Sequence, residues 1–229
     1  MGLGSSWGQV LDVLEQIIPV YDKVNSFISL GKDRQFRENG IRGRVNKGDK
    51  ILDAGSGFGN MSKTAMNLCD DDLEISLYDP LRPMLKNTGR LFAKPPSLTC
   101  GVFEHLPFKD ENFDAVLCGY SLRDAISLRI AISEIHRVLK KGGRFVIVDL
   151  GKPDNPLIRM GVSFYLRAIL PVIALIAGGK LGLKFAALYD TYKFWPQNKK
   201  LELLLLEKFA RVEFDTGMMG GAVIVAAYK

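Results

Sequence analysis

The sequence predicts an α/β protein with a doubly wound, mostly parallel sheet of seven strands and an antiparallel C-terminal hairpin. Strand patterns alternate with amphipathic helical patterns from Asp49 to Leu150, which is typical of a parallel sheet with helices on both faces. A glycine-rich turn follows the first strand, and two consecutive strand patterns close the chain. The expected strands are 50–54, 74–78, 98–103, 113–118, 143–150, 211–218 and 221–229, with helices at 60–69, 81–93, 124–140 and 201–209.

Punctuating residues support these boundaries. Pro95-Pro96 interrupts the second helix of the alternating region. Lys141-Gly142-Gly143 ends the third with cations and a residue that tolerates the left-handed conformation. Asp124 is suited to cap the N-terminus of a helix that runs through Leu139.

Residues 1–45 are expected to form an N-terminal helical segment in front of a domain that spans residues 46–229. Apolar residues recur on one helical face (Val10, Leu14, Ile17 and Ile18), and Pro19 interrupts this helix. A second helix is expected over 21–31, with Gly31 as its C-cap. The segment is either a plain layer over the sheet or a flap over a ligand site, with Tyr21 and Arg34 facing that site.

Composition and charge limit the classes of partner and the cellular location that we expect. The 229 residues carry a net charge of +6, which is compatible with an anionic membrane surface or with nucleic acid. Cys69, Cys100 and Cys118 lack the spacing of a redox or metal motif and are interpreted as reduced core residues. The first ten residues do not read as a secretory signal. We therefore expect a cytoplasmic protein.

The stretch ILDAGSGFG (51–59) is the strongest indication of a ligand. Gly55, Gly57 and Gly59 allow the backbone to approach a ligand closely. Their spacing differs from the dinucleotide fingerprint, and Asp53 is unfavourable beside a pyrophosphate. The cationic S-adenosylmethionine, which carries no phosphate, fits better, and Asp79 is placed to bind its ribose. NAD sites also place an acid at this distance, and a glycine turn can serve tight packing alone.

Further polar residues follow the third and fourth strands at the same sheet edge. The segment 101–114 places Glu104, His105 and Pro107 where a base-like ring could lie. The fourth strand leads into Tyr120, Ser121, Leu122, Arg123 and Asp124. Arg123 is suited to hold an anionic substrate oxygen at this edge.

Several motifs together resemble class I S-adenosylmethionine-dependent methyltransferases, and more narrowly the ubiquinone/menaquinone C-methyltransferases. They are DAGSGFG, Asp79, EHLPF, FDAV…SLRD…EIHRVLKKGGRFVIVD, YDKVNSFISLGKDRQFR, DLGKP and TGMMGGAVIVAAYK. The likeness covers nearly the whole chain from about residue 20. The family usually has Asp or Asn at Val102, Asn at Asp124 and His at Asp33.

The resemblance implies a set of site residues. Those for S-adenosylmethionine are Asp53, Ala54, Gly55, Ser56, Gly57, Asp79, Pro80, Val102, Phe103, Glu104 and Tyr120. Within this set, Asp53, Gly55 and Gly57 would line the methionine end, Asp79 would bind the ribose, and Val102 and Phe103 would flank the adenine. Arg123, Asp124 and Tyr21 would surround the substrate ring as catalytic residues. No metal is implied.

The implied reaction is C-methylation of a demethylated isoprenoid quinol of the menaquinone or ubiquinone type. Another small lipophilic molecule or a lipid is the alternative acceptor. In this reaction Arg123 would stabilise the phenolate, and Asp124 or Tyr21 would accept a proton or position the ring. A nucleic-acid substrate is disfavoured, because the chain has no N-P-P-[YFW] motif after the fourth strand and no Lys/Arg-rich arm. A homodimer is compatible with the sequence.

Residues 157–185, within an insert at 155–200, are the most apolar part of the chain. The run AILPVIALIA is shorter than a bilayer span, and Arg167, Pro171 and Gly178-Gly179 interrupt its surroundings. The insert is either a core helix under the sheet or a lid that admits an isoprenoid tail. A lid would touch the inner face of the membrane, with headgroup contacts from Arg159, Arg167, Lys180 and Lys184.

Overall fold

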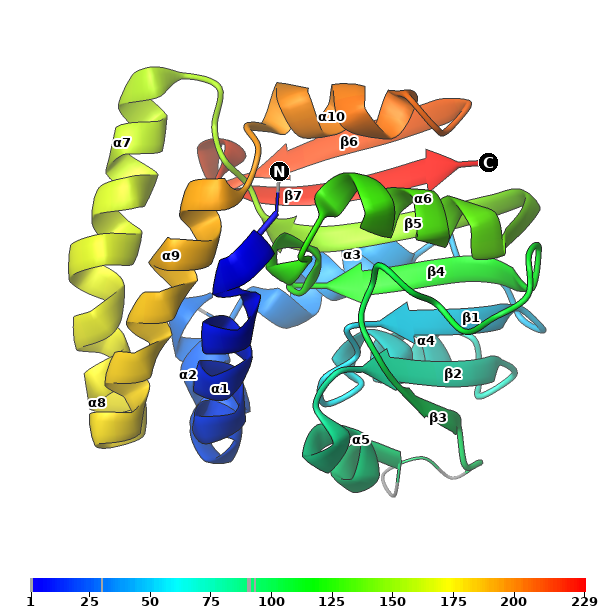
Figure 1. The fold of residues 1–229 in the computed structure, drawn as a ribbon, viewed down its shortest axis with the longest axis horizontal. Coiled ribbons are helices and arrows are strands. Elements are labelled where there is room, and N and C mark those ends of the chain that lie inside the picture. The colour runs from blue at the N-terminus through cyan, green and yellow to red at the C-terminus, as the bar shows by residue number, and fades with distance from the viewer. Residues whose placement is uncertain (1, 30, 90–91, 93) are drawn as a thin grey trace.

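A seven-stranded sheet forms the centre of the computed structural model, which describes residues 2–29, 31–89, 92 and 94–229 (Figure 1). The strand order is β3-β2-β1-β4-β5-β7-β6. The first five are mutually parallel, and β7 runs antiparallel to both of its neighbours. This confirms the predicted fold class. The strands are β1 Lys50–Ala54, β2 Glu74–Asp79, β3 Ser97–Cys100, β4 Phe113–Gly119, β5 Leu139–Leu150, β6 Arg211–Gly217 and β7 Ala222–Tyr228.

Helices cover both faces of the sheet. On one face lie α6 (Leu128–Val138) and α10 (Asn198–Leu206), whose apolar residues share a core with inward-facing residues of β1, β4, β5 and β7. On the other face lie α3 (Asp33–Ile41), α4 (Asn60–Leu68) and α5 (Arg82–Gly89). Each large apolar side chain buried in these cores stabilises the fold by roughly 1.5–3 kcal/mol.

The remaining long helices form a cap at the carboxyl edge of the parallel strands (Figure 1). The cap consists of α1 (Trp7–Ile17), α2 (Tyr21–Ile28), α7 (Pro156–Phe164), α8 (Leu170–Gly182) and α9 (Ala187–Phe194). Its apolar cluster joins the N-terminal segment to the insert through contacts that include Ile17, Val24, Leu170 and Phe185. A Cβ on Gly178 would lie 2.8 Å from Val24, so this glycine lets α2 and α8 pack closely. By contrast, α3 packs on the sheet.

In its described residues, the N-terminal segment contains the α-helices α1, α2 and α3. Val10 and Ile17 are buried on the predicted face of α1, and α2 ends at Ile28. Gly31 follows with a φ of 72°, and its N–H donates to the Ser26 carbonyl at 2.8 Å, as in a left-handed C-terminal cap.

The helix expected over 124–140 is shorter than predicted. It begins at Leu128, and Asp124 lies in a separate 3-10 turn, so Asp124 is not its N-cap. Residues 139–143 are already part of β5 and do not end the helix. Long-range pairing explains the difference, because Leu139 pairs with Phe113 and the Gly142 N–H donates to the Lys229 carbonyl at 3.0 Å.

Smaller differences concern the second half of the alternating region. The helix predicted over 81–93 ends at Gly89 in the structure, and residues 90, 91 and 93 lie outside the described part of the chain. The strand predicted over 98–103 spans Ser97–Cys100. Cys69 and Cys118 are buried as predicted, but Cys100 is exposed because β3 is the edge strand of the sheet.

The insert does not lie under the sheet, so its interpretation as a core helix is wrong. Nine large apolar residues between Pro156 and Phe194 are exposed (Leu157, Met160, Phe164, Ile169, Val172, Leu175, Ile176, Leu183 and Phe194). The helical run over 156–194 is long and apolar enough to cross a membrane by length and composition, unlike the short run considered in the sequence. A π-helical turn at Tyr165–Ile169 and a φ of 61° at Gly179 interrupt it.

Candidate active site

The glycine-rich turn after β1 has the conformation that its sequence predicts. Gly55, Gly57 and Gly59 have φ values of 67°, 50° and 68°, in the region that favours glycine. A Cβ on Gly55 would lie 2.5 Å from Ser121 Oγ, and one on Gly59 would lie 2.7 Å from Thr88. At Gly57 the nearest such atom is 3.9 Å away. Two of these glycines therefore allow close packing, and Gly57 leaves space for a ligand.

Asp79 holds this turn at the end of β2. Its Oδ2 accepts from the Gly57 N–H and its Oδ1 from the Leu81 N–H, both at 2.8 Å. The carboxylate is buried, which raises its pKa above the ordinary value. Each oxygen keeps a lone pair for a ligand hydroxyl.

Asp53 has a different position from the one the resemblance implied. Its Oδ2 accepts from the Ser62 N–H at 3.0 Å and from the Ser62 hydroxyl at 2.7 Å, near the start of α4. Its Oδ1 has no hydrogen-bond partner among the described residues, and burial raises the pKa of Asp53 to about 7. The side chain does not line the cavity beside the turn. Asp53 therefore joins the end of β1 to the start of α4 and does not face the cavity.

Three other predicted residues also lie outside that cavity. Ala54 ends β1, and its carbonyl accepts from the Ser121 hydroxyl at 3.2 Å. Ser56 is buried within the turn. Glu104 accepts from the Ser127 N–H at 2.9 Å and so caps the start of α6.

The cavity beside the turn joins most of the predicted cofactor residues to α1. It is lined by Trp7, Val10, Leu11, Leu14, Tyr21, Gly55, Gly57, Asp79, Pro80, Leu81, Met84, Val102, Phe103, Tyr120, Ser121 and Asp124. The Tyr78 hydroxyl lies 3.0 Å from the Val102 carbonyl and 2.7 Å from the His105 carbonyl, which fixes the loop containing Val102 and Phe103.

The N-terminal segment thus covers the site, as the flap interpretation requires, and Tyr21 faces it. Arg34 does not. Its side chain is 81% exposed and its Nε donates to Glu38 at 3.0 Å, so this part of the expectation is wrong. Asp33 and Arg37 of the same helix line a different, larger cavity, which is described below.

The chemistry of this cavity fits S-adenosylmethionine. Its described lining contains two carboxylates and no lysine or arginine, which suits a cation and ribose hydroxyls and disfavours a phosphate. Val102 and Phe103 offer an apolar surface for a base. The volume, however, is about 70 Å³, well below the roughly 300 Å³ at the lower end of small-molecule sites. Side chains of α1 occupy the space, so this helix must withdraw when the ligand enters.

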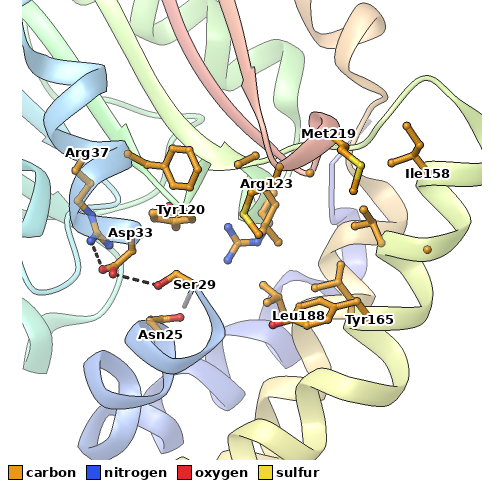
Figure 2. A pocket seen from close by; sticks show the side chains of 18 residues that line it. Asn25, Ser29, Asp33, Arg37, Tyr120, Arg123, Ile158, Tyr165, Leu188 and Met219 are labelled. Carbon is orange, nitrogen blue, oxygen red and sulfur yellow. Dashed lines mark hydrogen bonds and ion pairs between the residues drawn. The ribbon is translucent and has the colours of Figure 1, made fainter. Parts of the chain in front are cut away.

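A second, larger cavity of about 370 Å³ lies on the other side of Tyr120 (Figure 2). Most of its lining is apolar, and the lining residues come from the N-terminal segment, the ends of β4 and β5, the insert helices and the β6–β7 connection. The lining residues are Asn25, Ser29, Asp33, Phe36, Arg37, Tyr120, Arg123, Leu150, Ile158, Gly161, Val162, Tyr165, Leu166, Leu188, Met218, Met219, Gly221 and Ala222.

Tyr120 lines both cavities. It directly follows β4 and has a φ of 60°, an uncommon conformation for a residue with a side chain. Its N–H donates to the Val148 carbonyl at 2.7 Å, and the guanidinium carbon of Arg37 lies 5.0 Å from its ring centroid. The strained backbone places the ring between the two cavities.

Arg123 forms a buried ion pair with Asp149 at the end of β5. Its Nη1 lies 2.6 Å from Asp149 Oδ1, and its Nε lies 3.8 Å from Asp124 Oδ1. Burial lowers the pKa of Arg123, but Asp149 and Asp124 outweigh this effect and raise it above its usual value. The guanidinium therefore stays charged and is held in the wall of the larger cavity.

The three predicted catalytic residues meet around a third cavity of about 40 Å³. Tyr21, Arg123 and Asp124 all line it. Burial raises the pKa of Asp124 to about 6, against the opposing effect of Arg123. Burial also raises the pKa of the Tyr21 hydroxyl. Of these three residues, Asp124 is the one whose protonation changes nearest to neutral pH.

Sequence reasoning missed Trp7, Arg37 and Met219 as site residues. Helical periodicity does not say which face of α3 would meet a ligand, so Arg34 and Arg37 could not be distinguished. Met218 and Met219 have φ values of 51° and 56°, and their turn lies beside α7 only in the folded chain.

Solved structures share this fold. A methyltransferase of Thermotoga maritima has a TM-score of 0.66 at 15% identity, over 95% of this chain and 98% of that one. One of Aquifex aeolicus has a TM-score of 0.61 at 14% identity, over 90% and 96%. Both are named S-adenosylmethionine-dependent methyltransferases. The sheet with its glycine turn is thus the class I S-adenosylmethionine-dependent methyltransferase fold.

Sequence comparison narrows this class. The sequence model of the ubiE/COQ5 methyltransferase family matches residues 4–229, and the chain belongs to that family. The demethylmenaquinone methyltransferase of Clavibacter sepedonicus is 30% identical over 90% of this chain and 84% of its own length. The 2-phytyl-1,4-naphtoquinone methyltransferase of a Nostoc species is 30% identical over 93% and 96%.

The movement of α1 that ligand entry requires predicts a fluorescence change on cofactor binding. The chain has two tryptophans, and only Trp7 lines the cofactor cavity, whereas Trp195 is buried in the core with its Nε1 donating to the Leu150 carbonyl. Titration with S-adenosylmethionine should therefore change the intrinsic emission of the wild-type protein and of Trp195→Phe, but not of Trp7→Phe. A change that survives in Trp7→Phe and disappears in Trp195→Phe would contradict a movement of α1 on ligand entry.

Proposed function

We propose that the protein methylates a ring carbon of a demethylated isoprenoid quinol. The observation that carries this proposal is the larger apolar cavity, which meets the cofactor cavity at Tyr120 and contains an arginine in its wall. Such a cavity suits a flat, mostly apolar ring with polar oxygens. Two relatives support the same substrate class, since they are named demethylmenaquinone methyltransferase and 2-phytyl-1,4-naphtoquinone methyltransferase.

The isoprenoid tail would leave the cavity between α7 and the turn after β6. Ile158 and Met219 line the cavity at this end, and Met219 is 80% exposed. Figure 2 shows both side chains on the side of the cavity away from Arg37. The volume of about 370 Å³ accommodates a ring and little more, so a long tail must pass outward here.

The chain's own residues would prepare the ring for methylation. Asp124 accepts the proton of a ring hydroxyl, and the resulting negative charge is shared with the neighbouring ring carbon, which becomes nucleophilic. N–H groups of Arg123 stabilise the oxygen anion. S-adenosylmethionine, when bound, supplies a methyl group already activated by its positive sulfur. The methylated carbon then loses its hydrogen as a proton to water, which restores the aromatic ring, and the ring oxygen takes back its proton from Asp124. The net products are the methylated quinol, the neutral thioether of the methyl donor and one proton.

This mechanism predicts a pH dependence. Asp124 must be deprotonated to accept a proton, and its pKa is about 6, so kcat/KM should rise with pH through about 6 and level off above it. Asp124→Asn, which introduces the residue that the family usually has here, should remove this limb and leave kcat/KM independent of pH over the same range. Steady-state rates between pH 5 and 8 check both points. An unchanged limb in Asp124→Asn would exclude Asp124 as the base.

Product analysis tests the proposed function directly. The protein is incubated with S-adenosylmethionine and a dithionite-reduced, short-chain demethylmenaquinol, and the extract is examined by mass spectrometry. A product heavier by one methylene is expected, and Asp79→Ala should abolish it because that carboxylate holds the cofactor turn. If calorimetry detects binding of S-adenosylmethionine but the extract contains no methylated quinol, the result would contradict the proposed substrate and favour a different lipophilic acceptor.

The cap would also attach the protein to the inner face of the membrane. Its exposed apolar residues extend from the tail exit along α7 and α8, and Arg167 and Lys180 are exposed beside them. Two other predicted headgroup ligands contact the protein instead, since Arg159 donates to the Pro153 carbonyl and Lys184 to Gln16. This surface supports a peripheral contact in which the quinol moves directly between bilayer and cavity.

Vesicle binding tests this contact. Leu157, Phe164 and Ile176 are 73%, 63% and 76% exposed, and each contributes roughly 1.5–3 kcal/mol when buried in hydrocarbon. Replacing all three with Asp should lower binding to vesicles of phosphatidylcholine and phosphatidylglycerol by about 100-fold or more in a sedimentation assay. Ile130→Asp, at an exposed apolar residue on α6 away from the cap, is the matched control and should bind normally. Equal binding by all variants would contradict a membrane surface on the cap.

A further inference from the structure

Two arginines from separate parts of the chain line the larger cavity. Arg37 comes from α3, and Arg123 from the turn after β4. Figure 2 shows Tyr120 between their guanidinium groups, with the rest of the cavity beyond. Arg37 is 9% exposed and Arg123 7%, and within the described chain the Nε of each has no hydrogen-bond partner. Both therefore keep a buried donor that the protein does not satisfy.

A carboxylate orients each guanidinium. Arg37 Nη1 donates to Asp33 Oδ2 at 2.6 Å, and Arg123 Nη1 donates to Asp149 Oδ1 at 2.6 Å. Asp33 is held in turn by the Ser29 hydroxyl, which lies 3.1 Å from its Oδ1. Each arginine thus uses one edge for its partner and retains other N–H groups for a ligand.

Helix stability does not account for the Arg37 pair. An Asp–Arg pair four residues apart contributes little to the stability of an exposed helix, and burial beside an apolar cavity adds a desolvation cost. The exposed Arg34–Glu38 pair on the same helix gives such support without that cost. Contact with Tyr120 gives Arg37 one role, but its unpaired Nε and its place in the cavity wall indicate a ligand as well.

We propose that Arg37 is a second oxygen-binding group, so that the cavity selects a ring with oxygens at its two opposite ends. This inference rests on the proposed function. Arg123 holds the oxygen next to Asp124, which lines the cofactor cavity, and Arg37 holds the opposite oxygen. The pair of contacts rejects rings with a single hydroxyl and determines which ring carbon faces the methyl donor.

The test compares two matched acceptors, 2-prenyl-1,4-dihydroxynaphthalene and 3-prenyl-1-naphthol, which lacks only the second oxygen. The wild-type kcat/KM should favour the diol. Arg37→Met should lower the value for the diol by about 10- to 100-fold and leave that for the naphthol nearly unchanged, because a hydrogen bond from a charged group is lost only with the diol. Arg34→Met, on the exposed side of α3, should leave both values unchanged.

A structural role of Arg37 would give a different result. If Arg37 only supports Tyr120, then Arg37→Met will lower kcat/KM by the same factor for both acceptors, and this outcome overturns the proposal. Asp33→Asn/Arg37→Met removes the charge left on Asp33 and should reproduce the loss of preference with a cofactor affinity equal to that of the wild type.

Failure of the proposed function can be distinguished from failure of the two-arginine site. If the wild-type protein methylates neither compound, calorimetric binding of 1,4-dihydroxynaphthalene and 1-naphthol still tests the two-arginine site. A preference for the diol that Arg37→Met abolishes would support it without turnover. Equal affinity of the wild-type protein for both compounds would overturn it.

Discussion

The buried ion pair between Arg123 and Asp149 is the interaction on which the site depends. It joins the turn after β4 to the end of β5, the neighbouring strand, at the point where the sheet meets the cap. An arginine buried among apolar residues is costly without a partner, and removing one member of such a pair typically costs about 3–5 kcal/mol. With Asp149 in place, Arg123 holds its charge beside Asp124 and within the wall of the larger cavity. The pair thus fixes a cation in the wall of the larger cavity, beside Asp124, which lines the cavity at the glycine turn.

The cap supplies the other constraint. Because α1 and α2 share one apolar cluster with the insert helices, the helix that covers the cofactor and those that line the larger cavity are parts of one body. The parallel sheet below remains a separate support with its own two cores. Because the cap and the sheet have separate cores, the cap can move when the cofactor enters while the glycine turn and Asp79 keep their positions.

Much of the sheet could be predicted from sequence because its signals are local. Strand alternation, the glycine turn and the closing hairpin each lie within a short segment, and Asp79 follows from the position of a strand end. Residues 139 and 140 were assigned to the helix and 141–143 to its end, because the pairing of Leu139 with Phe113 and of Gly142 with Lys229 is long-range and leaves no local signal. Asp53 and Glu104 were placed at the ligand from motif position alone, whereas backbone N–H groups of α4 and α6 attract their carboxylates. The roles of Arg37 and Trp7 depend on tertiary packing that no local pattern encodes.

A crystal structure with S-adenosylhomocysteine and 1,4-dihydroxynaphthalene tests the central claim most directly, namely that two ligand cavities meet at Tyr120. The account predicts the nucleoside at the glycine turn with its ribose on Asp79. It places the dihydroxynaphthalene ring in the larger cavity beside Tyr120, with one ring carbon facing the cofactor sulfur directly. A ring bound outside the larger cavity, or separated from the sulfur by the Tyr120 side chain, would contradict the account.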